Sequence, residues 1–302
     1  MKRFVDLGDL TREEVLTLLE LARRLERLPE PRALAGKLLG LVFFNPSLRT
    51  LASFQAAMAR LGGHTVVINP GQGSWQMETR AGVVMDGAAA EHVREGIPAL
   101  ASYCDALGIR LFAAGRDLAS DLAETGFNAL AALTDKPLVN LESAVNHPCQ
   151  ALADWKTLDD LAVARGARFV LSWAYHPRAL PPAIMERARR TAAASGGSVR
   201  ETSERAEALA AADVLYVKEW GATESYGDAA VDARLRAPLR SWCVRNVWFA
   251  AAPACRVLHC LPVRRNCAIA DEVLDSGRSI VQREAYNRLP VQMAVLHQLL
   301  RT

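Results

Sequence analysis

The sequence lacks a long apolar run, a closely spaced cysteine pair and a block of basic residues. No stretch reaches the roughly 18 apolar residues that a membrane span requires, and residues 1–15 carry charges throughout instead of the apolar segment of a signal peptide. The six cysteines form no CxxC pair and show no zinc-binding spacing. A net charge of +3, spread along the chain, is too small for a nucleic-acid or membrane-surface protein. We therefore expect a cytoplasmic protein with reduced thiols.

Lysine is also scarce, because arginine makes up nearly the whole basic set. The five lysines are Lys2, Lys37, Lys136, Lys156 and Lys218, so a lysine at a functional site needs a reason. What is present is an ordinary soluble composition, with 51% hydrophobic and 23% charged residues. The 302 residues are enough for two domains of about 150 residues each.

Apolar runs alternate with amphipathic stretches along the chain, which is typical of an α/β protein. Asp9 or Thr11 can cap a first helix. The other expected helices lie over 47–61, 91–103, 147–162 and 284–300, and strands are predicted within 37–44, 61–69, 106–112, 137–143, 167–175, 212–220 and 254–262. A domain boundary near 143–150 is expected, because the long helix there can connect two similar halves.

The segment FFNPSLRT (43–50) follows a predicted strand and opens a predicted helix. Ser47, Arg49 and Thr50 therefore lie where free backbone N–H groups point outward, which makes an anion site, and an arginine there can bind phosphate through two hydrogen bonds. The alternative is an ordinary N-cap serine beside a solvated arginine. No GKS or GKT sequence is present, which excludes a P-loop.

Two other strand ends carry polar side chains. In HPCQ (147–150), His147 and Gln150 can address a small polar ligand at the carboxyl end of a strand, although a capping or core histidine is the alternative. In HCLP (259–262), Cys260 lies between an apolar run and a proline that stops the strand, and a structural thiol is the alternative.

Together, the S-L-R-T, H-P-C-Q and H-C-L-P motifs, in this order, resemble the carbamoyltransferase family, which includes the aspartate and ornithine enzymes. The resemblance covers almost the whole chain. It implies two α/β domains, each with a central parallel sheet flanked by helices, joined by interdomain helices. The carbamoyl-phosphate domain would span 1–143, with the C-terminal helix 284–302 packing back on it, and the acceptor domain would span 144–283. The resemblance also implies a homotrimer with shared active sites and a reaction without metal or cofactor.

The resemblance further assigns roles to individual residues. Arg110 and His147 would polarise the carbamoyl carbonyl, and Cys260 would flank the reaction centre. Arginines around a dianion make chemical sense, because the leaving phosphate gains charge in the transition state. The residues implied to bind carbamoyl phosphate are Ser47, Leu48, Arg49, Thr50, Trp75, Arg110, His147, Pro148, Cys149, Gln150, Cys260, Leu261 and Arg288, of which Trp75 would reach the site of a neighbouring subunit.

Within this family the chain resembles the acylornithine carbamoyltransferases, which act on N-acetyl- or N-succinylornithine. The segments that carry this likeness are QGSWQMET (72–79), VVMDG (83–87), His176-Pro177, Lys218-Glu219-Trp220 and HCLPVRRN (259–266). The residues that the resemblance places against the acylornithine are Glu142, His176, Lys218, Leu261 and Arg264.

The residue at position 90 is expected to determine which acyl group the protein accepts. The acetyl type has a glutamate just before a Glu-His pair and the succinyl type a proline, whereas this chain has Ala90. A carboxylate there would repel a succinyl carboxylate, and alanine removes that repulsion. The favoured reaction is carbamoyl transfer to N-succinyl-L-ornithine in arginine biosynthesis, with N-acetyl-L-ornithine as the alternative acceptor. A catalytically dead paralogue that binds acylornithine or scaffolds a partner is a further alternative, although the complete motif sets argue against it.

Two departures from the family pattern remain. Leu51 follows the S-L-R-T motif where relatives often have a second arginine. The stretch 184–214 is also short for the strand and helix expected there, which leaves open whether the second domain lacks one βα unit.

Overall fold

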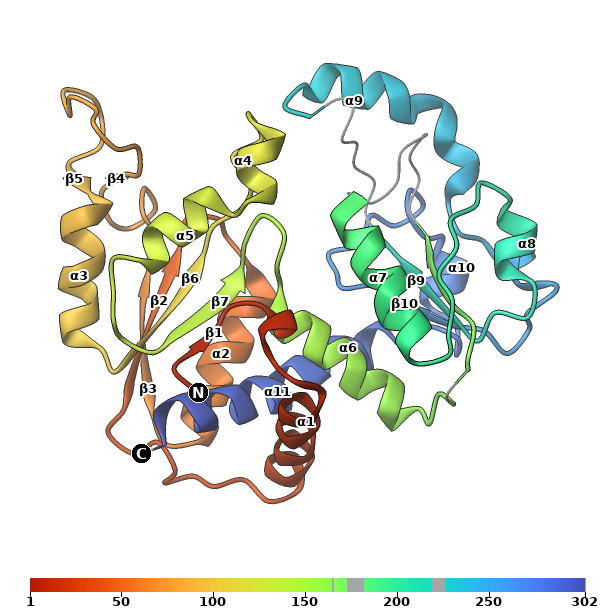
Figure 1. Cartoon of the computed structure of the whole chain (residues 1–302), viewed down its shortest axis with the longest axis horizontal. Helices are drawn as coiled ribbons and strands as arrows, with labels where there is room; N and C mark the ends of the chain where they lie inside the picture. The colour runs from red at the N-terminus through yellow and green to blue at the C-terminus, as the bar shows by residue number, and fades with distance from the viewer. Residues whose placement is uncertain (165, 173–181, 219–225, 302) are drawn as a thin grey trace. The chain divides into compact units, whose positions relative to one another are not determined.

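The structure is a computed structural model that describes residues 1–164, 166–172, 182–218 and 226–301 (Figure 1). The chain divides into two compact units. Unit 1 comprises Met1–Thr157 and Tyr286–Thr302, and unit 2 comprises Leu158–Ala285. Two helices carry the chain from one unit to the other, α6 (Pro148–Asp160) and α11 (Val281–Leu300). The division falls inside α6, later in the chain than the boundary expected at 143.

Unit 1 is built on a sheet of five strands in the order β1-β7-β6-β2-β3, in which every neighbouring pair is parallel. The apolar runs in the sequence predicted four of the five, and these four predictions are confirmed. The strands are β1 (Arg3–Phe4), β2 (Leu38–Phe43), β3 (His64–Ile68), β6 (Ala106–Arg110) and β7 (Leu138–Glu142). The fifth, β1, has two residues, which is too short for a periodic pattern to reveal.

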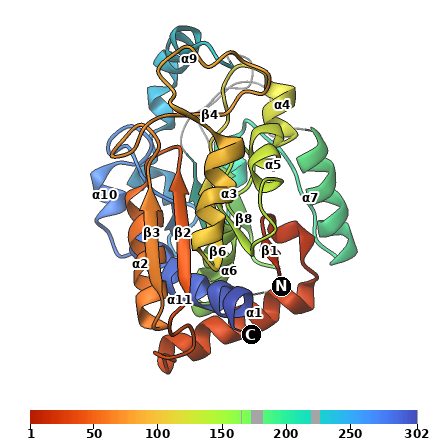
Figure 2. The same ribbon diagram turned by 90° about the vertical axis from the view of Figure 1, so that its left-hand side faces the viewer.

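Helices cover both faces of this sheet (Figure 2). Because successive side chains of a strand point to opposite faces, Leu39, Leu41 and Phe43 of β2 pack with α1, α2, α6 and α11, whereas Val42 packs with α3 and α5. The helices of unit 1 before α6 are α1 (Arg12–Arg27), α2 (Leu48–Arg60), α3 (Val93–Tyr103), α4 (Leu118–Leu122) and α5 (Thr125–Ala131), preceded by the 3-10 turn Leu7–Asp9.

Local sequence signals explain where two of these helices begin or end. Thr11 caps α1 in a reciprocal capping box with Glu14, so the second of the two predicted capping residues is the one used. After α2, Gly62 has a φ of +84°, and a Cβ atom there would lie 2.1 Å from the carbonyl oxygen of Pro31. Only glycine therefore fits the turn that leads from α2 into β3.

Unit 2 contains a smaller parallel sheet of three strands in the order β10-β9-β8, and all three fall within predicted runs. They are β8 (Phe169–Ser172), β9 (Val214–Val217) and β10 (Arg256–Leu258). The helices are α7 (Pro182–Ala194), α8 (Arg205–Leu209), α9 (Ala229–Arg236) and α10 (Asp271–Leu274), with 3-10 turns over Ala237–Trp242 and Asn246–Phe249.

The edge strand β8 of this smaller sheet carries exposed apolar side chains. Between β8 and β9 the described residues form α7 and α8 and add no further strand. Phe169 and Leu171 of β8 are 48% and 37% exposed, and Met185 is the one buried residue of α7. Across the described ranges of both units, no helix combines the length and apolar character needed to cross a membrane.

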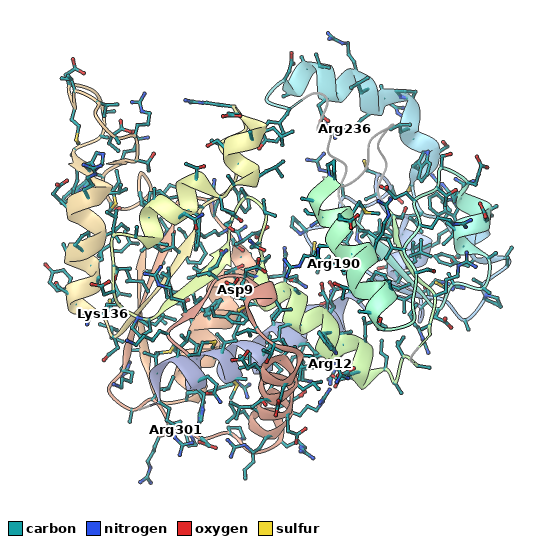
Figure 3. The ribbon with its side chains drawn as sticks, viewed as in Figure 1. Asp9, Arg12, Lys136, Arg190, Arg236 and Arg301 are labelled. Atoms are coloured by element: carbon teal, nitrogen blue, oxygen red, sulfur yellow. The ribbon has the colours of Figure 1, made fainter. Side chains whose placement is uncertain are left out.

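The parallel direction of the unit 1 strands determines where a site can form. The carboxyl ends of β2, β6 and β7 lie at one edge of the sheet, so the residues that follow these strands gather there. Lys37 and Lys136 precede β2 and β7 and so lie at the opposite edge. Figure 3 labels Lys136.

Candidate active site

The S-L-R-T segment forms the start of α2 immediately beyond β2. Ser47 caps the helix by accepting a hydrogen bond from the backbone N–H of Thr50 at 3.2 Å. Leu48 is 80% exposed, Arg49 is half-buried and Thr50 is fully buried. From α11, Arg288 donates to the Thr50 hydroxyl at 2.7 Å. The segment therefore presents a helix N-terminus beside two arginines, which is an arrangement suited to an anion.

Arg110, at the end of β6, occupies the same edge of the sheet. Its side chain is buried, its Nε donates to the carbonyl oxygen of Asn45 at 3.1 Å, and its guanidinium lies 4.4 Å from the centre of the Phe112 ring. Its Nη1 forms an ion pair with Glu142 at the end of β7. The His147 Nε2 lies 3.5 Å from the same Glu142 carboxylate. Three strand ends thus contribute to one polar cluster.

The charges of this cluster are unbalanced. Burial lowers the pKa of Arg288, and the positive charges of Arg49 and Arg110 lower it further, while Cys149 and Glu142 act in the opposite direction. Among the described residues, Arg49, Arg110 and Glu142 therefore all act electrostatically on Arg288. A dianionic ligand would neutralise the excess positive charge, and phosphate has the oxygen atoms to accept hydrogen bonds from several guanidinium groups.

The H-P-C-Q segment forms the start of α6. The carbonyl oxygen of His147 accepts hydrogen bonds from the N–H groups of Gln150 and Ala151, at 2.9 and 3.1 Å, and Pro148 is the first helical residue. Gln150 donates to Asp154 at 2.7 Å. Cys149 is fully buried, and this burial raises the pKa of its thiol to about 12. Cys149 is therefore a neutral packing residue beneath the cluster.

Unit 2 carries a second polar group in the H-C-L-P segment. The Nζ of Lys218, at the end of β9, lies 3.4 Å from the Sγ of Cys260. Burial raises the pKa of the Cys260 thiol, but a hydrogen bond to His259 and the charge of Lys218 outweigh it, and the net result is a lowered pKa. The structure therefore brings together two residues that the sequence analysis placed in the site, and it gives the thiol an anionic tendency.

The other residues that the sequence analysis predicted in unit 2 are Leu261, Arg264 and His176. Leu261 has a left-handed backbone, with φ of 55°, and its N–H donates to the His259 Nδ1 at 2.9 Å. Arg264 is exposed. His176 lies outside the described residues.

Trp75 and Ala90 come from two segments that the fold brings side by side. The two-residue strand β4 (Met77–Glu78) pairs in parallel with β5 (Glu91–His92). Trp75 is 59% exposed, and its ring nitrogen donates to the Glu91 carboxylate at 2.6 Å. Ala90 is exposed and directly precedes Glu91. The pairing of β4 with β5 therefore places the proposed acyl-reading position beside the residue that holds Trp75.

Two residues that hold the cluster in place were missed by the sequence analysis. The side-chain oxygen of Asn45 accepts a hydrogen bond from the N–H of Phe112 at 2.8 Å, which ties the end of β2 to the end of β6. Glu124 binds the turn between β7 and α6. Asn45 had a possible signal, since it lies within the FFNPSLRT segment. Glu124 lies between two short helices and carries no pattern of its own.

An α/β unit with arginines gathered at the carboxyl ends of its parallel strands has the architecture of a protein suited to a small phosphorylated ligand. Comparison with known families gives the particular chemistry. Residues 2–160 match the aspartate/ornithine carbamoyltransferase carbamoyl-P binding domain, and residues 159–299 match the Asp/Orn binding domain. The chain belongs to the aspartate/ornithine carbamoyltransferase family, and it is a carbamoyltransferase.

Curated relatives divide among three acceptors. The N-acetylornithine carbamoyltransferase of Xanthomonas campestris is 34% identical over 332 aligned positions, which cover 99% of this chain and 98% of the relative. The N-succinylornithine carbamoyltransferase of Bacteroides thetaiotaomicron is 34% identical, with 88% of each chain covered. The ornithine carbamoyltransferase of Parafrankia is 34% identical over 97% of this chain and 94% of the relative. Because the first alignment is longer than 302 residues, the Xanthomonas protein has residues that this chain lacks.

Solved structures agree in fold over the whole chain. An acetylornithine transcarbamylase complexed with acetylcitrulline has a TM-score of 0.93 and 33% identity, with 100% of both chains covered. An N-acetyl-L-ornithine transcarbamylase with one glutamate replaced by alanine, complexed with carbamyl phosphate and N-succinyl-L-norvaline, has a TM-score of 0.92 and 33% identity, with 99% of this chain and 100% of that chain covered. The predicted fold class and the predicted resemblance to acylornithine carbamoyltransferases are confirmed.

Proposed function

We propose that this protein transfers the carbamoyl group of carbamoyl phosphate to the δ-amine of N-succinyl-L-ornithine, giving N-succinyl-L-citrulline and phosphate in arginine biosynthesis in the cytoplasm. The observation that carries the proposal is the cluster of Arg49, Arg110 and Arg288 around the start of α2, in a chain of this family. Such a cluster binds the phosphate of one substrate, and the acceptor residues come from Glu142 and from unit 2.

The polar cluster supports a direct transfer. The δ-amine attacks the carbamoyl carbon, the C–O bond to phosphate breaks, and the proton of the amine leaves with phosphate or with a nearby base. Arg110 and His147 polarise the carbonyl, so they stabilise the oxyanion of the tetrahedral intermediate. Arg49 and Arg288 stabilise the growing charge of the leaving phosphate, and this stabilisation is larger in the transition state than in the ground state.

Ala90 favours the succinyl group over the acetyl group. A solved acetylornithine enzyme in which alanine replaces a glutamate holds N-succinyl-L-norvaline, so an alanine in that enzyme is compatible with a succinyl ligand. We assign Ala90 to the corresponding position. The second candidate acceptor is N-acetyl-L-ornithine, which is favoured by the fuller coverage of this chain by the Xanthomonas acetylornithine enzyme.

Exposed apolar residues before and after β4 support a homotrimer with shared sites. Trp75 is accompanied by two further exposed apolar residues, Val84 at 83% and Met85 at 41%. Trp75 precedes β4, and Val84 and Met85 lie between β4 and β5. Several exposed apolar side chains in one short part of the chain are typical of a surface that a partner covers. We propose that Trp75 completes the carbamoyl-phosphate site of a neighbouring subunit, with Glu91 holding its ring.

The deciding experiment is citrulline formation from carbamoyl phosphate with ornithine, N-acetylornithine and N-succinylornithine in parallel. We expect the highest kcat/KM with N-succinylornithine. A preference for N-acetylornithine would change the proposed acceptor and leave carbamoyl transfer as the proposed reaction. No product with any of the three, together with retained carbamoyl phosphate binding, would establish a dead paralogue.

Substitutions test the residues behind this assignment. Ala90→Glu should lower kcat/KM for N-succinylornithine by about a hundredfold and spare N-acetylornithine, because two carboxylates repel in a partly desolvated site. Ala88→Glu adds the same charge two residues earlier and should change kcat/KM for neither acceptor.

The shared site is tested by mixing subunits. Subunits carrying Trp75→Ala and subunits carrying Arg110→Ala should regain activity when mixed. An active monomer in light scattering would contradict the trimer.

A further inference from the structure

Glu124 has an unusual backbone and an unusual side-chain environment. It joins α4 to α5, beyond the end of β6 (Figure 1), and its φ of 55° lies in the left-handed region that side chains other than glycine avoid. Its own position is fixed by two backbone hydrogen bonds, from its N–H to Asp121 at 3.0 Å and from the Asn128 N–H to its carbonyl at 2.8 Å. An unfavourable backbone persists where the surrounding structure over-determines it, and such positions cluster at functional sites.

A single carboxylate oxygen of Glu124 receives four hydrogen bonds. The donors to Oε1 are the Ser143 hydroxyl at 2.6 Å, the Val145 N–H at 2.9 Å, the Asn146 N–H at 3.1 Å and the Asn146 side-chain amide at 3.3 Å. All four come from one short turn, over residues 143–146. Ionised acceptors form stronger hydrogen bonds than neutral ones, so this oxygen fixes the conformation of the turn.

The same turn connects two residues of the polar cluster. It leaves β7 directly after Glu142 and enters α6 directly after His147. Within the turn, the Ser143 N–H donates to the Asn146 carbonyl at 2.8 Å, and the buried Asn140 amide donates to the Ser143 hydroxyl at 2.7 Å. The conformation of the turn therefore sets how Glu142 and His147 approach each other.

We propose that Glu124 is a positioning residue for carbamoyl transfer, which acts by holding the 143–146 turn so that His147 and the Glu142–Arg110 pair keep their orientation. This inference rests on the proposed function. A role limited to stability would need only a capped turn, and the bonds from the Ser143 N–H to the Asn146 carbonyl and from Asn140 to the Ser143 hydroxyl already supply one. The additional carboxylate, on a strained residue from a different element, fixes geometry beyond what the turn itself requires.

Three variants test the inference. Glu124→Ala removes the acceptor, and Glu124→Gln keeps an acceptor oxygen at the same reach without the charge. Asp117→Ala is the matched control, because it removes a carboxylate that caps α4 nearby through the Ala119 N–H at 3.0 Å. We expect Glu124→Ala to lower kcat about a hundredfold, because a misplacement of about 1 Å has effects of that size, with a smaller change in KM. Glu124→Gln should recover most of the loss, and Asp117→Ala should match the parent.

A second readout does not require turnover. The imidazole signals of His147, assigned with a His147→Asn variant, should shift in Glu124→Ala and return in Glu124→Gln. Undisturbed imidazole signals and an undiminished kcat in a folded Glu124→Ala protein would overturn the inference, as would a Glu124→Gln variant no better than Glu124→Ala. If the parent itself transfers no carbamoyl group, the proposed function fails, while the imidazole signals still decide the role of Glu124.

If Glu124→Ala does not fold, Ser143→Ala takes its place. This substitution removes one of the four donors and leaves the backbone of the turn intact. An intermediate loss of kcat and a smaller imidazole shift are then expected. A Ser143→Ala protein that matches the parent in both readouts would overturn the inference.

Discussion

The two units of the chain differ in how the predicted site residues of each are held in place. In unit 1, the interior strands β2, β6 and β7 are mostly buried along their length, and Arg110, Glu142 and Arg288 are held near their carboxyl ends by direct contacts. In unit 2, the described residues include the contact between Lys218 and Cys260, and Arg264 is exposed. The arginines of unit 1 are therefore fixed by contacts at strand ends, whereas Arg264 of unit 2 lies in an exposed segment beyond β10.

This difference has a chemical reason. Under the proposed function, the phosphate of the first substrate is the same whichever acceptor is used, so a rigid set of arginines at strand ends is suited to it. Acceptors differ among the relatives, which use acetylornithine, succinylornithine or ornithine. Loops change more readily than strands do, and a site that must vary is better placed on them.

The largest effect is expected from breaking the polar network inside unit 1. Lys156 is fully buried, its Nζ lies 2.7 Å from Glu26 and 3.2 Å from the Asn287 side-chain oxygen, and Asn287 donates to Thr157 at 2.9 Å. Removing one partner of a buried ion pair leaves a buried charge, so Glu26→Ala should lower the free energy of unfolding by about 3–5 kcal/mol.

Chemical denaturation measures this loss, and Glu20→Ala is the control. Glu20 lies in the same helix, is 70% exposed, and approaches Arg23 at 3.9 Å, so its removal should change the free energy of unfolding by less than about 0.5 kcal/mol. Adding Lys156→Met to Glu26→Ala should recover much of the loss. Equal effects of Glu26→Ala and Glu20→Ala would show that the network does not stabilise unit 1.

Hydrogen exchange compares the two sheets directly. β2 is an interior strand with five buried residues, and β8 is an edge strand with two exposed apolar residues. Amides in elements with few buried contacts open more often, so we expect the amides of β2 to exchange about a hundredfold more slowly than those of β8. Equal protection of the two strands would show that unit 2 is as stable as unit 1.

Binding of carbamoyl phosphate separates the two halves of the site. Arg49→Ala should weaken binding by about 1.5–3 kcal/mol, because it removes charge-assisted hydrogen bonds to the phosphate. Lys218→Met, in unit 2, should leave the Kd of carbamoyl phosphate unchanged and raise the KM of the acceptor. Calorimetry of the first substrate and steady-state kinetics of the second distinguish the halves. Binding within twofold of the parent for Arg49→Ala would remove that residue from the phosphate site.

The smallest effect is expected for the Cys260 thiol. Its pKa lies below the ordinary value, so the thiolate is already present at a lower pH than in a free cysteine, and alkylation should reach its plateau at that lower pH. Lys218→Met removes a positive charge, raises the pKa and should slow alkylation by iodoacetamide at pH 7 by about threefold. Cys267, the other half-buried thiol, is the internal control. An unchanged pH profile in Lys218→Met would exclude an electrostatic role for the lysine.

Apolar periodicity was sufficient to predict the strands that have a buried face. β2, β6 and β9 are compact runs of apolar residues, and long parallel strands need such runs because both faces are covered. The two-residue strands β1, β4 and β5 were not predicted, because a periodic pattern needs several residues to repeat. Their positions follow from tertiary contacts rather than from local preference.

The candidate site also combines residues that local sequence predicts with pairs that only the tertiary fold brings together. Ser47, Arg49 and His147 were predicted because they lie at strand-to-helix junctions, where local sequence and local geometry coincide. The pairing of Arg110 with Glu142 joins residues 32 positions apart, and that of Arg288 with Thr50 joins residues 238 apart. A local sequence pattern cannot reveal pairs that are so far apart in the chain. Resemblance to a family suggested these residues, and the fold brings them together.

The three arginines of unit 1 have a consequence for regulation by mass action. An anion that binds only the folded protein raises its stability, by about 2.7 kcal/mol at a concentration one hundred times its Kd. Orthophosphate, the product of the proposed reaction, carries the same oxygens that the arginines bind. It should therefore raise the melting temperature and compete with carbamoyl phosphate, so the rate in a cell would follow the ratio of the two ligands rather than the amount of either alone.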